Sequence, residues 1–198
     1  MAWDTQETRR RLLAAAIDEF SSSGFAGARI DRIAKLSGCN RERIYFYFGG
    51  KAQLFEAALT QQLVTALEGV AITGSGFGAA GEFAGRYFDA SLAQPDLARL
   101  ILWEGLECGT PVDAERRALR ATRKVKDLQQ ALPGADQKAV EELLLTIVTL
   151  CHGWVASPNL IPVITSNPDN DRHRRTVVRV AELLAADASG LARSADHP

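Results

Sequence analysis

Cysteine is scarce in this sequence: Cys39, Cys108 and Cys151 are the only three among 198 residues. Three scattered cysteines are too few for a disulfide framework or a four-ligand zinc site, so we expect them to be reduced and structural. The sequence also lacks the run of about 18 to 20 uncharged apolar residues that a membrane span needs. Its first residues lack the basic and then apolar pattern of a secretion signal. These absences predict a cytoplasmic protein with no membrane partner.

No compositional extreme is present either. Hydrophobic residues make up 46% of the chain and charged residues 24%, while glycine and proline together contribute 23 residues, which excludes a disordered or fibrous protein. The length allows one compact domain or two small ones that share a core. Alternation of apolar and polar residues with period two is missing at useful length, whereas helical periodicity is present throughout. The sequence therefore predicts an all-α protein.

The net charge of −1 is distributed unevenly. Residues 1–51 hold nine basic and six acidic groups, a balance of +3, and the remaining residues hold 14 basic and 18 acidic groups. We call residues 1–51 the head and residues 75–198 the body, joined by a helix over about 51–72. A basic head favours a polyanionic partner, although the solvated face of a helix gives the same count.

The apolar spacing, with glycine and proline as boundaries, predicts nine helices. Gly24 is expected to stop the first helix, Gly38 to end the second, and Asn40 to cap the third. Glycines at 74–78 predict a hinge or loop, and residues 189–198 are expected to form a frayed tail. A long loop is expected at 158–168. The predicted helices cover about residues 5–23, 29–37, 41–48, 51–72, 80–93, 96–108, 113–132, 136–157 and 169–188.

The segment from Gly24 to Lys51 has helix-turn-helix spacing: a short helix, a tight turn at Gly38 and a second short helix. In such a motif the second helix lies in a major groove and presents its N-terminal side chains to base edges. Arginine can bond guanine bidentately, and glutamate can accept from the amino group of cytosine. We therefore predict that the first turn of this helix reads DNA sequence, through Arg41, Glu42 and Arg43.

A second group of side chains in the same segment is suited to phosphate oxygens. Tyr45 and Tyr47 offer hydroxyl donors, and Lys51 offers an ammonium group where the next helix begins. These three residues are expected to fix the register of the protein on DNA. Two helices of an ordinary bundle, with solvated arginines, are the alternative interpretation of this spacing.

The residues of the head are similar to the DNA-binding part of the TetR family of bacterial regulators. The similarity lies in GFAGARIDRIAKLSGCN (residues 24–40), IYFYFGGK (residues 44–51) and Leu54-Phe55, and it spans about residues 8–60. The resemblance implies a homodimeric repressor that binds a palindromic DNA operator and responds to a small-molecule ligand. It also implies that the last two long helices form the dimer interface.

The chain departs from the family pattern at two positions. Arg29 stands where the family usually has a threonine that caps the second helix, and Tyr47 stands where it often has a histidine that meets a phosphate. Arg29 can itself bond the DNA backbone, so we add it to the predicted phosphate contacts. The sequence then identifies no N-cap for the second helix.

In the body, a mixture of aromatic and acidic side chains predicts an apolar ligand pocket with polar anchors. Aromatic residues at helical spacing also fill the interior of a bundle, which is the alternative for each of them. The candidate pocket residues are Phe83, Tyr87, Phe88, Trp103, Glu104 and Glu107.

Three fragments of the body look like parts of enzymes or of a second basic surface. Residues 76–81 match G-x-G-x-x-G, but no strand is expected before them, so a linker is favoured over a dinucleotide site. His152 lacks partners at metal-ligand spacing and is expected to be packed or polar-bonded. The basic run at 172–175 is expected on a solvated face or dimer rim. We predict no catalytic residues, metal or cofactor; the alternative is a helical small-molecule-binding protein or enzyme that uses residues 77–107 and never meets DNA.

Overall fold

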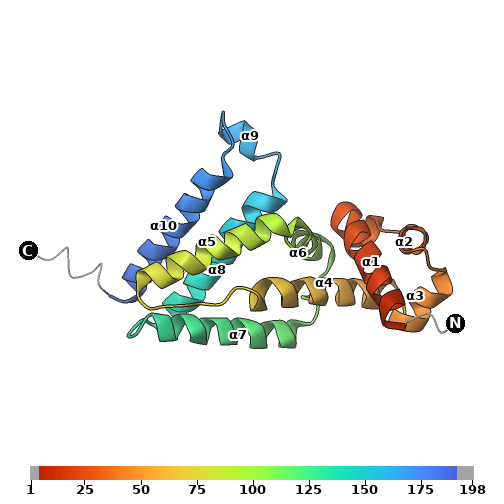
Figure 1. Cartoon of the computed structure of the whole chain (residues 1–198), viewed down its shortest axis with the longest axis horizontal. Coiled ribbons are helices and arrows are strands. Elements are labelled where there is room, and N and C mark those ends of the chain that lie inside the picture. The colour runs from red at the N-terminus through yellow and green to blue at the C-terminus, as the bar shows by residue number, and fades with distance from the viewer. Residues whose placement is uncertain (1–4, 191–198) are drawn as a thin grey trace, which may run out of the picture. The chain divides into compact units, whose positions relative to one another are not determined.

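The computed structural model describes residues 5–190, apart from the side chains at positions 65, 67 and 68. Within this range the chain is all-helical, as the sequence predicts, and has ten helices and no strand (Figure 1). The helices are α1 (Thr5–Gly27), α2 (Ile30–Ser37), α3 (Arg41–Phe48), α4 (Lys51–Glu68), α5 (Phe77–Ala93), α6 (Pro95–Glu107), α7 (Ala114–Ala131), α8 (Gln137–Ala156), α9 (Ile161–Ile164) and α10 (Asn170–Ala188).

The helices differ from the sequence prediction at three places. The short helix α9 lies inside the segment 158–168, where we expected a loop. Helix α5 begins at Phe77, so most of the expected linker at 76–81 is helical, whereas residues 74–76 of the expected hinge stay non-helical. Gly24 breaks α1 with φ 71° and ψ 177° but the helix resumes and reaches Gly27. The predicted tail, from residue 191 on, lies outside the described residues.

The chain divides into two compact units that interleave along the sequence. The first unit contains the residues up to Thr65 together with Asp96–Ala114, and the second contains Ala66–Pro95 together with the residues from Glu115 on. The boundary therefore falls within α4. The head and body of the sequence prediction follow chain order, whereas the structure assigns α6 to the first unit.

The first unit is built on an apolar core under α1. Phe20 and Phe55 are fully buried, and their rings meet edge to face with centroids 5.1 Å apart. The ring of Phe25 packs against Phe55 at 5.4 Å. Ile33 of α2 and Ile44 of α3 are also fully buried, so each of the two short helices is attached to this core by an apolar side chain on its inward face.

The second unit has its core around α5, which packs against both α8 and α10 (Figure 1). Phe83, Tyr87 and Phe88 of α5 are at most 1% exposed. Leu128 of α7 and Ile147 of α8 complete the same cluster. Three buried residues within six positions make α5 the central helix of this unit.

Helix α8 has apolar side chains on its exposed side as well as on its buried side. Among the described residues it is the one helix long and apolar enough to cross a membrane by length and composition, with mean hydropathy 1.4 and only 33% of its apolar stretch buried. Its buried side, which includes Leu143 and Ile147, belongs to the core of the second unit. Its outer side leaves Leu145 58% exposed.

Candidate nucleic-acid interface

The turn between α2 and α3 is a left-handed glycine turn. Gly38 has φ 64° and ψ 27°, a conformation that costs little only for glycine. Its backbone N–H donates to the Lys35 carbonyl at 3.2 Å, and the Arg11 guanidinium donates to the carbonyl of the preceding residue, Ser37. The turn that the sequence predicts is therefore confirmed. The bond from Arg11 attaches this turn to α1.

Helix α3 begins with a side-chain cap. The Asn40 Oδ1 accepts a hydrogen bond from the backbone N–H of Arg43 at 3.2 Å, which satisfies one of the donors that a helix start leaves without an intrahelical partner. The predicted cap is confirmed. It places Arg41 and Glu42 in the first turn, and both side chains are exposed.

The two arginines of this turn have partners of their own. The Nε of Arg41 forms an ion pair with Asp31 of α2 at 3.1 Å, and the Arg41 side chain remains 57% exposed. The Nη1 of Arg43 donates to the Thr8 hydroxyl of α1 at 3.4 Å, and this side chain is half-buried. Arg41 and Glu42 thus form the accessible part of the predicted base-reading set, while Arg43 lies against α1.

The start of α2 is capped by a residue that sequence reasoning missed. Arg29 occupies the N-cap position in an extended conformation and makes no cap bond with its own side chain, which is exposed. The Oε1 of Glu19, on α1, accepts instead from the Arg29 backbone N–H at 2.9 Å and pairs with the Arg32 Nε at 3.4 Å. Glu19 is only 4% exposed. The sequence held one indication of this cap, because Glu19 lies beside the apolar face of the first predicted helix.

The predicted phosphate contacts differ in accessibility. Tyr45 is 49% exposed and Tyr47 is half-buried. The Nζ of Lys51 donates to the Ala26 carbonyl at 3.3 Å and lies 5.0 Å from the centre of the Phe25 ring. Lys51 therefore also ties the start of α4 to the end of α1, a structural role that the sequence did not indicate.

Three of the predicted pocket residues lie on α6 and belong to the first unit. The Trp103 Nε1 donates to the Ser21 carbonyl at 3.2 Å, and the Glu107 Oε2 accepts from the Ala26 N–H at 3.0 Å. The Glu104 Oε1 accepts from the Val112 N–H at 2.7 Å. Helix α6 thus uses these three residues to hold α1 and its own following loop.

The break in α1 explains how the Trp103 ring approaches so closely. A Cβ atom at Gly24 would lie 2.8 Å from the Trp103 ring, closer than real Cβ contacts. The left-handed φ of 71° also favours glycine at this position. Gly24, which the sequence identified as a helix stop, is therefore the place where α6 meets α1.

The other three predicted pocket residues, Phe83, Tyr87 and Phe88, are buried in the second unit. The Tyr87 hydroxyl and the His152 Nε2 are 3.0 Å apart and hydrogen-bonded. Burial lowers the pKa of His152 to about 4, so the imidazole is neutral at pH 7, and burial raises the pKa of Tyr87. The prediction that His152 is packed or polar-bonded is confirmed, and the structure shows both features.

A second polar group enters this core from α7. The Lys124 side chain is buried, and its Nζ donates to the Val70 carbonyl at 2.9 Å. The same Nζ lies 5.7 Å from the centre of the Phe83 ring. The second unit thus contains a lysine and a neutral histidine among its buried aromatic rings.

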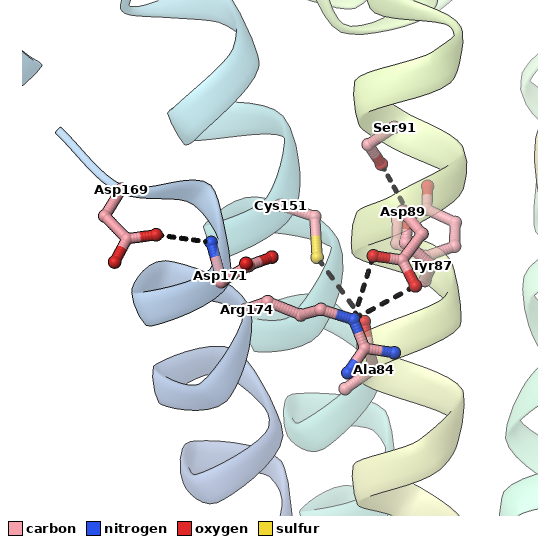
Figure 2. Close-up of polar contacts among 8 residues, drawn as sticks. All are labelled: Ala84, Tyr87, Asp89, Ser91, Cys151, Asp169, Asp171 and Arg174. Carbon is pink, nitrogen blue, oxygen red and sulfur yellow. Dashed lines mark hydrogen bonds and ion pairs between the residues drawn. The ribbon is translucent and has the colours of Figure 1, made fainter.

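The basic run at 172–175 is only partly solvated. The Nε of Arg174 donates to both carboxylate oxygens of Asp89 at 2.9 and 3.0 Å, which joins α10 to α5 (Figure 2). The ring of His173 stacks on Trp154 with centroids 3.9 Å apart. Arg172 and Arg175 are exposed, as predicted for a solvated face.

Cys151 is buried beside the same helix pair. Its Sγ is directed at the Ala84 carbonyl at 4.0 Å (Figure 2). Burial raises the pKa of this thiol to about 12, so it stays protonated at neutral pH. Cys39, Cys108 and Cys151 are all free, which agrees with the expectation of reduced cysteines.

Comparison with known proteins gives matches over both parts of the chain. Residues 12–58 match the family described as bacterial regulatory proteins, tetR family, and residues 80–182 match the tetracyclin repressor-like C-terminal domain. The chain is 32% identical to the HTH-type transcriptional repressor SCO4008 of Streptomyces coelicolor over 173 residues, which cover 85% of this chain and 88% of that protein.

Two further relatives agree with these matches. The HTH-type transcriptional regulator RutR of Escherichia coli K12 is 28% identical over 158 residues, covering 78% of this chain and 65% of RutR. The crystal structure of SCO4942 from Streptomyces coelicolor superposes with a TM-score of 0.72 at 29% identity, covering 89% of this chain and 97% of that chain.

The capped helix-turn-helix and the helical C-terminal part, together with these matches, define the class of protein as a DNA-binding transcriptional regulator. The chain belongs to the TetR family of bacterial regulators. Regulators of this family bind DNA operators, act as dimers and are typically cytoplasmic.

Proposed function

We propose that two copies of this chain repress transcription from a palindromic operator, with α3 of each copy in a major groove, until a small molecule bound in the second unit releases the DNA. The observation that carries this proposal is the exposed first turn of α3, with Arg41 and Glu42 displayed beside the Asn40 cap. Such a turn suits the base edges of a major groove.

The roles within the interface follow from accessibility. Arg41 bonds a guanine and Glu42 accepts from a cytosine, while Arg43 reaches a base only when its bond to Thr8 is exchanged for one to DNA. The remaining contacts bond phosphates and set the register without reading sequence. These phosphate contacts are Arg29, Tyr45, Tyr47 and Lys51.

The dimer uses the outer faces of α8 and α10. Leu145 of α8 is 58% exposed and Leu183 of α10 is 52% exposed, although both helices bury their opposite sides in the core. Two-thirds of the apolar stretch of α8 is likewise not buried in a single copy. A two-fold dimer places the two α3 helices on half-sites about 34 Å apart, one turn of the duplex.

The ligand site lies among Phe83, Tyr87 and Phe88. These rings are fully packed, so a ligand has to displace side chains to enter. The Tyr87 hydroxyl, the His152 Nε2 and the Lys124 Nζ are the polar atoms among them that can anchor it. An apolar molecule with one or two hydrogen-bonding groups fits this composition.

Helix α4 carries the response toward the DNA. It begins in the first unit, where Leu54 and Phe55 are core residues, and it leads into Val70 in the core of the second unit. Lys124 holds the Val70 carbonyl, so a ligand that engages Lys124 pulls on the segment that follows α4. The ligand releases DNA because it binds the conformation that cannot bind DNA more tightly than the conformation that can.

Selection of binding sites from a random DNA library tests the function directly. We expect the selected sequences to share a palindrome whose half-sites are one duplex turn apart. Equal recovery of all sequences, with an affinity that depends on salt alone, would leave only non-specific phosphate binding and would contradict the proposal.

A further inference from the structure

Phe46 is an apolar side chain displayed at the surface of α3. It is 82% exposed, although large aromatic side chains are usually buried or partly buried in soluble proteins. Its neighbours Tyr45 and Tyr47, which belong to the predicted phosphate contacts, carry hydroxyl groups that explain their place at a polar surface. Phe46 has no polar atom and needs another explanation.

The direction of Phe46 follows from the geometry of α3. Ile44 is fully buried and marks the inward side of the helix. Two residues further on, Phe46 points about 160° away from Ile44, because each residue of an α-helix turns by about 100°. Glu42, four residues before Phe46, lies on the same outward face. The ring of Tyr47 meets the Phe46 ring edge to face at 5.1 Å and 82°, which supports it from one side.

The chemistry of the ring limits its partner on DNA. A phenyl ring cannot hydrogen-bond a phosphate oxygen or the polar edge of a base. The apolar group in a major groove is the C5-methyl of thymine, and phenylalanine is one of the side chains that contact it. Four residues advance a helix by about 6 Å, which corresponds to about two base-pair steps from the base that Glu42 contacts.

We propose that Phe46 reads the C5-methyl group of a thymine in each half-site, about two base pairs from the position read by Glu42. This inference rests on the proposed function, because it needs α3 in the major groove. The surroundings favour DNA over an apolar protein surface as the partner: Arg41 precedes Phe46 on the same short helix, and the head carries an excess of basic groups.

Deoxyuridine substitution isolates the methyl group. In the selected operator, each thymine of a half-site is replaced in turn by deoxyuridine, which keeps base pairing and removes only the methyl. The dissociation constant is measured by fluorescence anisotropy at fixed salt. For the wild-type chain we expect one symmetric position to weaken binding by about fourfold per half-site, the change that corresponds to one buried methyl group.

The Phe46→Ala variant completes the test. This variant is expected to bind the unmodified operator more weakly than the wild type, and its affinity should not fall further when deoxyuridine stands at the sensitive position. Phe46→Leu should keep part of the difference in affinity between thymine and deoxyuridine. Phe77→Ala, which changes a phenylalanine that is 37% exposed on α5, serves as the matched control and should behave like the wild type. Circular dichroism checks that each variant is folded.

The possible failures are distinguishable. If the operator is bound specifically but deoxyuridine has the same effect on the wild type and on Phe46→Ala at every position, the role of Phe46 is overturned and the proposed function stands. If Phe46→Ala changes the oligomeric mass, the ring belongs to a contact between copies and the inference is wrong. A chain without any sequence preference overturns both proposals.

Discussion

The Glu19 carboxylate of α1 accepts the backbone N–H of Arg29 at 2.9 Å and thereby caps α2 from a neighbouring helix. Because the capped residue has no cap bond of its own, the first turn of α2 depends on a side chain ten positions earlier in the chain. The same carboxylate pairs with Arg32. The orientation of α2, and with it the turn that leads into α3, is therefore set from α1.

Glu19→Ala should destabilise the protein by about 1 to 3 kcal/mol, because it leaves a helix-start donor and an arginine without their acceptor. Chemical unfolding followed by circular dichroism measures the change in the free energy of unfolding. Glu56→Ala, at an exposed position of α4, is the matched control and should change it by less than about 0.5 kcal/mol. Equal effects of the two variants would show that the cap contributes nothing.

His152 should make stability depend on pH. Its folded pKa of about 4 lies below the ordinary value of 6.5, so between these two values the unfolded chain binds a proton that the folded chain does not. The free energy of unfolding is then unaffected at pH 7 and falls as the pH drops through this window, by up to about 3 kcal/mol at pH 4.

His152→Gln should flatten this dependence, which unfolding curves at pH 7, 6, 5 and 4 can measure. A residual slope is expected because burial also lowers the pKa of His173. If the variant and the wild type lose stability in parallel from pH 6.5 to 4, the buried imidazole is not the responsible group.

Leu145→Glu should convert the dimer to a monomer, because it places a charge in the apolar face that we assign to the interface. Sedimentation velocity measures the mass. Leu119→Glu, at a leucine that is 61% exposed on α7, is the control and should leave the dimer intact. A Leu145→Glu dimer with unchanged affinity would place the interface elsewhere.

The sequence predicted the parts of the fold that depend on neighbouring residues. Gly38 as a helix end and Asn40 as a cap are local devices, and the structure confirms both. Helix α9 was missed because it has only four residues, Pro162 among them, which are too few to show a period. The start of α5 was missed because glycines at 74–81 lower helix propensity, which packing in the second unit overrides.

The candidate sites could be predicted less completely. Arg41 and Glu42 were located through the spacing of the helix-turn-helix segment, and both are exposed. The cap from Glu19 and the attachment of Trp103 to Ser21 join residues 10 and 82 positions apart. Local patterns carry no information about such pairs, so only the folded chain shows that α6 belongs with α1.

The central claim is that the first turn of α3 reads DNA sequence, whereas the contact of Lys51 with DNA is to a phosphate and carries no sequence information. The most direct test measures the affinity of Arg41→Ala and Lys51→Ala for the selected operator and for a scrambled duplex at several salt concentrations, with Arg123→Ala on α7 as control. We expect Arg41→Ala to reduce the ratio of specific to non-specific affinity by about tenfold or more, the effect of losing one bidentate base contact. Lys51→Ala should weaken binding to both duplexes alike. It should also lower the slope of log affinity against log salt concentration by the contribution of about one phosphate contact. An unchanged ratio for Arg41→Ala would contradict the account.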